Sequence, residues 1–90
     1  MADKSPSLTL PDLPGQYRWQ RSDRGARIFL DYRAERFGRA GRRNIGHFPE
    51  KVLRHVLLGE RLEGEPWLKR ARRLESLLRR WRISFPLAKH

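Results

Sequence analysis

The sequence has 90 residues, of which 21 are lysine or arginine and 10 are aspartate or glutamate, so its formal net charge is +11. A chain of this length predicts one domain with a small core and little room for a deep substrate pocket. The absence of cysteine excludes disulfides, thiolate metal sites and cysteine nucleophiles. No apolar run is long enough to span a bilayer, and Met1–Ser7 lacks the apolar core of a signal peptide. We therefore expect a soluble protein of the bacterial cytoplasm or nucleoid.

Arginine carries nearly all of the positive charge, since lysine occurs only at Lys4, Lys51, Lys69 and Lys89. The planar guanidinium fork matches phosphate oxygens and guanine edges in a way that the lysine ammonium does not. A polyanion is therefore the expected partner, and nucleic acid is the most common polyanion. A GC-rich coding sequence is an alternative reason for arginine over lysine, but it does not explain the excess of positive charge.

The first fifteen residues, 1–15, contain Pro6, Pro11 and Pro14, which forbid a regular helix and disfavour a central strand. We expect a flexible or extended arm in this segment. Its leucines are able to fold back over the core, namely Leu8, Leu10 and Leu13.

Residues 16–64 are predicted to form a three-stranded sheet and a helix. Aromatic and polar residues alternate over Tyr17–Ser22, and apolar and polar residues alternate over Ala26–Ala34, as in half-buried strands. Asp23–Gly25 and Glu35–Gly41 contain glycine and are expected to be turns, which leaves Arg42–Phe48 as the third strand.

The alternation predicts an apolar face and a polar face of this sheet. Ile28, Leu30 and Tyr32 share one face of the second strand, and we expect Ile45 of the third strand beside them. Gly46 indicates a bulge or a close approach of the backbone.

Two helices are predicted after the sheet. Pro49 and Glu50 suit a helix start, Val52–Leu57 supplies an apolar face for packing on the sheet, and the helix should end near Gly59. The second helix is predicted over residues 65–82, before a short tail of residues 83–90. The fold class is thus α+β, a small three-stranded antiparallel sheet packed on one helix and followed by a second, basic amphipathic helix.

The apolar residues of the second helix recur at alternating steps of four and three, as in helix packing, at Trp67, Ala71, Leu74, Leu78 and Trp81. This seam has three alternative roles. It docks on the domain and completes its core, it forms a homodimer, or the helix presents a basic surface to nucleic acid, acidic protein or anionic lipid.

Catalytic chemistry is not expected. The histidines are His47, His55 and His90, and no HExxH, GxGxxG, P-loop or GxSxG pattern is present. We interpret the acidic residues as counter-ions of nearby arginines, because no two of them are placed for general acid–base catalysis. The sequence therefore predicts a protein that is not an enzyme and holds no metal or cofactor.

The polar face of the sheet is the main candidate site. Arginine, glutamine and asparagine bond purine edges bidentately, and a two- or three-stranded ribbon fits the major groove of DNA. The predicted DNA-binding residues are Arg18, Gln20, Arg27, Arg33, Arg42, Arg43 and Asn44. Candidates for phosphate contacts are Arg24, Arg36, Arg39, Arg72, Arg73, Arg79 and Arg80. The alternative is that the sheet charges are merely solvated and prevent edge-to-edge aggregation.

Part of the chain, from Leu13 to Leu58, resembles a known family of DNA-binding domains. Asp31-Tyr32-Arg33, Gly41-Arg42-Arg43 and Ile45-Gly46-His47-Phe48-Pro49, followed by the apolar helix, are similar to the N-terminal arm-binding domain of phage and island tyrosine recombinases. The resemblance implies a three-stranded sheet packed on a helix, as in plant AP2-type domains, that binds the DNA major groove through the sheet. The loop from Glu35 to Gly41 is longer than the usual hairpin, and the sequence does not contain the recombinase catalytic domain, so the resemblance implies DNA binding alone.

We therefore predict a protein that binds double-stranded DNA, as a regulator or recombination accessory factor of a phage or mobile element. One alternative is a small phage-type inhibitor or adaptor that binds an acidic host protein through the same basic surface. Another is an RNA-binding accessory protein, in which Trp19, Phe29 or Phe37 stacks on unpaired bases.

Overall fold

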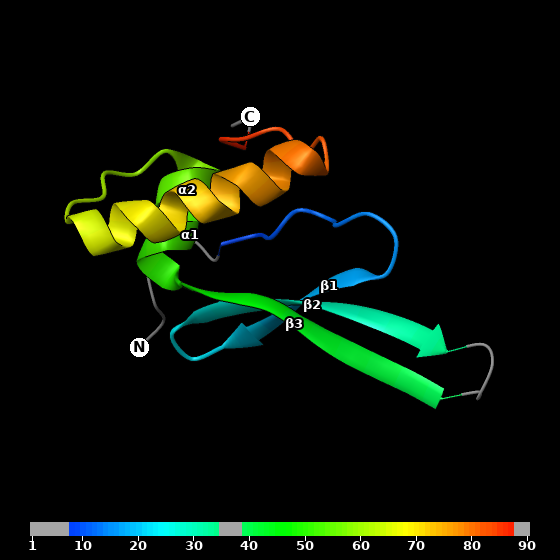
Figure 1. Cartoon of the computed structure of the whole chain (residues 1–90). Helices are drawn as coiled ribbons and strands as arrows, with labels where there is room; N and C mark the ends of the chain where they lie inside the picture. Colours follow the sequence, from blue (N-terminus) through cyan, green and yellow to red (C-terminus); the bar gives the residue numbers. More distant parts are fainter. Residues whose placement is uncertain (1–7, 35–38, 88–90) are drawn as a thin grey trace, which may run out of the picture.

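The computed structural model describes residues 8–34 and 39–87, which form three strands and two helices. These are β1 (Tyr17–Ser22), β2 (Gly25–Ala34), β3 (Arg39–Pro49), α1 (Glu50–Leu58) and α2 (Glu65–Arg80). The elements lie in two layers, with both helices on the same side of the sheet (Figure 1). The predicted fold, a small α+β domain with a three-stranded antiparallel sheet, is confirmed.

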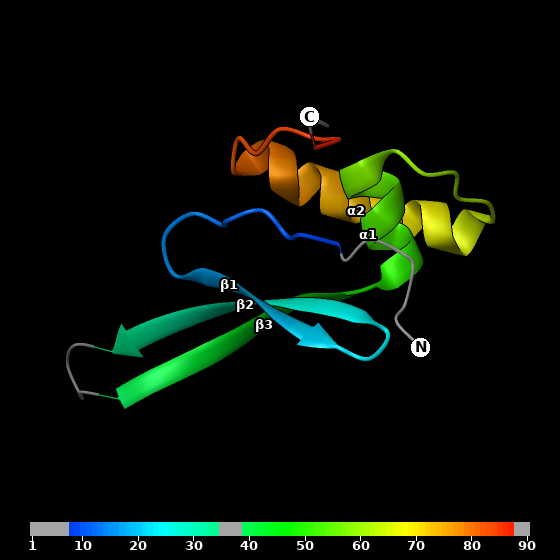
Figure 2. The same cartoon turned by 180° about the vertical axis from the view of Figure 1, so that it is seen from behind.

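The sheet has the order β1-β2-β3, with antiparallel pairing throughout. β1 pairs with only part of β2, since its first residue, Tyr17, pairs with Leu30 and its last, Ser22, pairs with Gly25. Beyond Leu30, β2 pairs with β3 alone, and this end of the hairpin projects past the helices (Figures 1 and 2). The helices therefore cover the part of the sheet near the β1–β2 turn.

β3 is longer than predicted, because it begins at Arg39 rather than at Arg42. Gly41, expected in the turn, lies inside the strand opposite Tyr32. A Cβ atom at position 41 would overlap the ring of Tyr32, so the glycine allows a close approach of that ring rather than a turn.

A bulge interrupts the pairing of β2 with β3 next to Gly46. Ile28 pairs with Gly46, whereas its neighbour Phe29 pairs with Asn44, which leaves Ile45 as the extra residue on β3. The irregularity expected at Gly46 is thus present. Its consequence is that His47 and Asn44, three positions apart, project from the same face of the sheet.

The core lies between the sheet and both helices. Apolar area removed from water there is the main source of folding stability. The core residues are Leu8 of the arm, Ala26, Ile28 and Phe48 of the sheet, Val52, Leu53, Val56 and Leu57 of α1, and Ala71, Leu74 and Leu78 of α2.

The expected inner face of the sheet is correct for Ile28 and only partly correct for the other residues. Leu30 is half-buried, and Tyr32 is 46% exposed, because both lie toward the projecting end of the hairpin. Ile45 is half-buried against the core, and Phe48, which was not expected there, is 1% exposed.

α1 has the predicted bounds for local reasons. Pro49 precedes its first residue, and Gly59 follows its last with φ 77°, a left-handed conformation that favours glycine. The Gly59 N–H donates to the His55 carbonyl oxygen at 3.0 Å, which caps the helix end. Neither described helix has the length and apolar character needed to cross a membrane.

α2 docks on the domain, which is one of the three roles considered for its apolar seam. Ala71, Leu74 and Leu78 are buried in the core, and Trp67 and Trp81 are half-buried against it. The three buried side chains therefore pack within the same chain, and homodimer formation through this helix stays a prediction. The helix ends at Arg80, slightly before the predicted Arg82.

Both segments that flank the folded elements also pack on the core. Leu8 of the arm is 3% exposed, and the indole Nε1–H of Trp19 donates to the Pro11 carbonyl oxygen at 2.7 Å. Residues 8–15 of the arm therefore fold back as expected and run between the sheet and the helices (Figure 2). After α2, the Leu87 N–H donates to the Leu57 carbonyl oxygen at 2.7 Å.

Candidate nucleic-acid interface

The strand register defines a sheet face that no described helix covers. Residues paired directly across antiparallel strands project from the same side. Arg18, Phe29 and Asn44 form one such row, and Ile28, adjacent to Phe29, faces the core, so the row projects away from the helices. We call this side the open face, and its side chains belong to Arg18, Gln20, Ser22, Arg27, Phe29, Asp31, Arg33, Arg42, Asn44 and His47.

The open face brings together the predicted DNA-binding residues with one exception. Arg18, Gln20, Arg27, Arg33, Arg42 and Asn44 are all exposed on it. Arg43 is also exposed, but it pairs with Leu30 and projects from the opposite face of the hairpin. Arg43 therefore lies apart from the other predicted residues.

Positive charge on the open face is little neutralised. Within residues 8–34 and 39–87, its one ion pair joins Arg42 to Asp31, with 3.2 Å between Nε and Oδ1. Arg18, Arg27 and Arg33 make no ion pair with another described residue. The remaining ion pairs of the described chain lie elsewhere, at Arg21–Glu50, Arg54–Glu50, Arg54–Glu60, Arg61–Glu63 and Arg72–Glu65.

An aromatic ring lies beneath the arginines of this face. Phe29 is only 6% exposed although it is not part of the core between the layers. The guanidinium carbon of Arg42 lies 4.0 Å from the centroid of its ring, within the range of a cation–π contact. The Arg42 side chain therefore lies over the ring, and little of Phe29 is exposed to solvent.

A hollow of about 750 Å³ lies toward the projecting end of the hairpin, and Arg18, Arg33 and Arg42 line it together with Asp31. A second hollow, of about 360 Å³, lies at the free edge of β3 and contains basic groups from α2. It is lined by His47, Arg70 and Arg73, and Arg73 Nη2 donates to the Ile45 carbonyl oxygen at 2.8 Å. Arginine side chains thus contribute to the lining of both hollows.

The predicted phosphate-contact residues do not form one surface. Arg73 reaches the edge of β3, and Arg24 lies exposed in the β1–β2 turn. Arg72 pairs with Glu65 at 2.9 Å, and Arg79 lies over the ring of Phe85. These two and Arg80 belong to the helical layer, on the other side of the sheet from the open face. Arg36 and the side chain of Arg39 lie outside the described residues.

Sequence reasoning missed Arg70, which joins Arg73 at the second hollow. The two residues are three positions apart in α2, and this spacing places side chains on the same flank of a helix. That spacing is the signal that would have found the pair.

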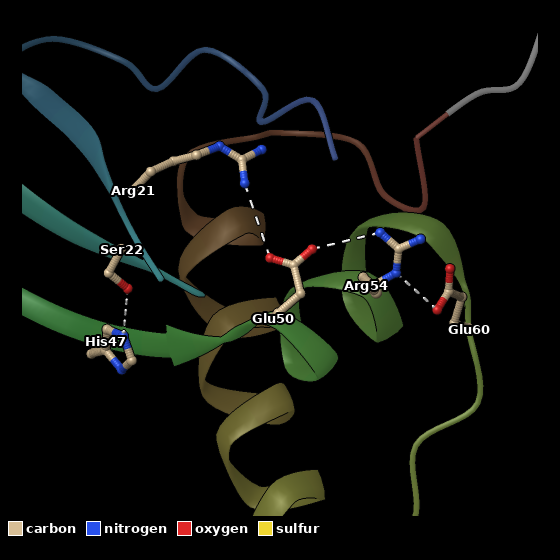
Figure 3. A network of polar contacts seen from close by, with 6 residues as sticks. All are labelled: Arg21, Ser22, His47, Glu50, Arg54 and Glu60. Atoms are coloured by element: carbon tan, nitrogen blue, oxygen red, sulfur yellow. Dashed lines mark hydrogen bonds and ion pairs between the residues drawn. The ribbon is translucent and has the colours of Figure 1, made fainter. Parts of the chain in front are cut away.

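A polar network lies at the junction between the sheet and α1 (Figure 3). Glu50 pairs with Arg21 of β1 at 4.0 Å and with Arg54 of α1 at 3.5 Å, and Arg54 also binds Glu60 at 3.2 Å. Glu50 and Glu60 thus act as counter-ions, as expected. On the open face nearby, Ser22 Oγ lies 3.3 Å from His47 Nε2.

Comparisons with protein-family models, curated proteins and solved structures found no match to the chain. The resemblance to recombinase arm-binding domains therefore depends on its motif residues alone. In the structure two of these motifs lie directly opposite each other, because Asp31 pairs with Arg42 and Tyr32 pairs with Gly41.

Proposed function

We propose that this chain binds duplex DNA by placing the open face in the major groove. The observation that supports this most strongly is the set of arginine, glutamine and asparagine side chains from three adjacent strands on one sheet face that no described helix covers. These side chain types make the bidentate contacts that distinguish guanine and adenine in that groove. The motif resemblance favours a regulator or recombination accessory factor of a phage or mobile element, acting in the bacterial cytoplasm or nucleoid.

The hairpin end of the sheet suits this groove. The major groove is about 12 Å wide and admits a two-stranded β-ribbon. Beyond Leu30, β2 pairs with β3 alone, so this end of the sheet is such a ribbon.

The aromatic residues favour groove binding over stacking on unpaired RNA bases. Trp19 projects toward the helices and is held by its hydrogen bond to Pro11, and Phe29 is covered by Arg42. Neither ring is free to stack on a base, as RNA recognition by aromatic platforms requires. Phe37 lies outside the described residues.

A mobility shift on duplex DNA tests the proposal. We expect affinity to fall steeply between about 50 and 200 mM salt, because each phosphate contact releases counter-ions. Arg27→Ala combined with Arg33→Ala should lower the affinity roughly tenfold or more and flatten the salt dependence. Arg42 is not the first choice for this variant, because it also contacts Asp31 and Phe29.

The matched control removes the same charge from the helical side of the molecule, by Arg61→Ala combined with Lys69→Ala. Both residues are exposed there, and this variant should retain affinity within about threefold. Equal losses in the two variants would show nonspecific charge attraction rather than binding by the open face. No shift on any duplex at low salt would falsify the proposal.

Affinity capture from a bacterial lysate, with and without nuclease, distinguishes DNA binding from the acidic-protein alternative. DNA binding predicts that co-purified material disappears after nuclease treatment. A stoichiometric acidic protein that survives nuclease treatment would favour the inhibitor or adaptor instead.

A further inference from the structure

Two neighbours on the open face hold the Arg42 side chain in place. Its Nε–H donates to Asp31 Oδ1 at 3.2 Å, and its guanidinium lies 4.0 Å above the ring centroid of Phe29. Asp31 is the direct cross-strand partner of Arg42, and Phe29 projects from the same face of β2 two residues earlier. Among the open-face arginines that the structure describes, Arg42 alone has both a carboxylate and an aromatic contact.

The contact with Asp31 leaves the outer fork of the guanidinium available. Asp31 accepts a hydrogen bond from Nε, and neither terminal nitrogen of Arg42 donates to another described residue. A guanidinium fork makes two parallel bonds to the O6 and N7 atoms of guanine, which is the commonest specific contact in the major groove. Arg42 also lines the larger hollow of the open face, so a base edge has access to it.

These contacts affect the orientation of the Arg42 side chain more than the folding stability of the domain. The side chains of Arg42 and Asp31 are 55% and 49% exposed, and ion pairs so exposed contribute little to folding. Phe29, a large apolar residue, occupies the polar face at 6% exposure beneath Arg42. A side chain already held in one orientation loses less conformational freedom when it binds.

We propose that Arg42 is the residue that selects a guanine in the bound DNA, and that Asp31 and Phe29 are its positioning residues. This inference rests on the proposed function and assigns one base contact within it. Arg27 lies on the same face without a carboxylate partner among the described residues, and it supplies phosphate attraction instead.

Selection of binding sites from a random duplex pool provides the test. The wild type should enrich a site with an invariant guanine, and exchange of that base should weaken binding roughly 5- to 150-fold. Replacement of the same guanine by 7-deazaguanine, which pairs normally but lacks the N7 acceptor, should also weaken wild-type binding.

Arg42→Ala and Arg27→Ala form a matched pair, since each removes one charge from the same face. Both should bind more weakly overall, but only Arg42→Ala should lose the preference for guanine and the sensitivity to 7-deazaguanine. Asp31→Asn should reduce the guanine preference without weakening binding to unselected duplex, because it removes a negative charge. If Asp31 had only a structural role, its replacement would not lower the guanine preference while leaving binding to unselected duplex unchanged.

Retention of the guanine preference by Arg42→Ala overturns the inference, as does tight duplex binding by the wild type with no enriched guanine. In both cases the proposed function still stands. Absence of duplex binding by the wild type, in contrast, contradicts the proposed function and the inference together.

Discussion

The two faces of the sheet place neighbouring residues of one strand in opposite environments. On β2, Ile28 is 0% exposed beneath the helices, whereas Arg27 is exposed on the open face. The helix-facing side contributes stability through buried apolar area. The open side carries several guanidinium groups at little cost in folding free energy, because these groups stay solvated. Alternate residues of the same strands therefore carry folding stability and surface charge.

Phe29 is the exception to this separation. It projects from the open face and yet is 6% exposed, and the guanidinium of Arg42 lies over its ring. The open face is therefore not simply a set of independent solvated charges. At this point its polar side chains are organised by an apolar one.

The largest expected effect concerns the helical layer that covers one face. Leu74→Asp combined with Leu78→Asp places two carboxylates at positions that are 0% exposed. An unpaired buried carboxylate costs several kcal/mol, and a small domain is stable by only about 5–15 kcal/mol. We expect the variant to be unfolded by circular dichroism. A folded monomer that replaces a wild-type dimer in light scattering would instead show that the α2 seam joins two chains.

The next effect compares the two faces directly. Ile28→Ala should lower the free energy of unfolding by about 2–5 kcal/mol, because it leaves a cavity in the core. Arg27→Ala should change it by less than about 0.5 kcal/mol, as is usual for exposed residues. Urea denaturation measures both changes in the free energy of unfolding. DNA affinity should show the opposite order, with the larger loss for Arg27→Ala. Similar destabilisation by the two variants would contradict the assigned faces.

The smallest expected effect tests the edge of the open face. Arg70→Ala combined with Arg73→Ala removes the α2 groups that line the hollow at the β3 edge. If the DNA backbone passes this edge, we expect roughly a threefold to tenfold loss of duplex affinity and a shallower salt dependence. Arg72→Ala combined with Arg79→Ala is the control with equal charge, and it should lose less. Indistinguishable salt slopes for the two variants would show that the β3 edge is not part of the DNA interface.

Features that depend on residues near one another in sequence were predictable. The bounds of β1 follow from its aromatic-polar alternation, and those of α1 from Pro49 and Gly59 at its ends. The same alternation predicted the open-face positions Arg18, Gln20, Arg27, Arg33, Arg42 and Asn44. These signals are local, because side-chain direction and helix capping depend on the few residues around each position.

Other features were decided by contacts between distant parts of the chain. Gly41 pairs with Tyr32 in a strand instead of forming a turn, and the bulge at Ile45 sets which β3 residues share the open face. The position of the helices decides that Phe48 is buried while Tyr32 is 46% exposed. Alternation shows only that two faces exist. Which stretch of a face is covered, and which aromatic residue lies beneath an arginine, depends on packing between elements that local patterns do not encode.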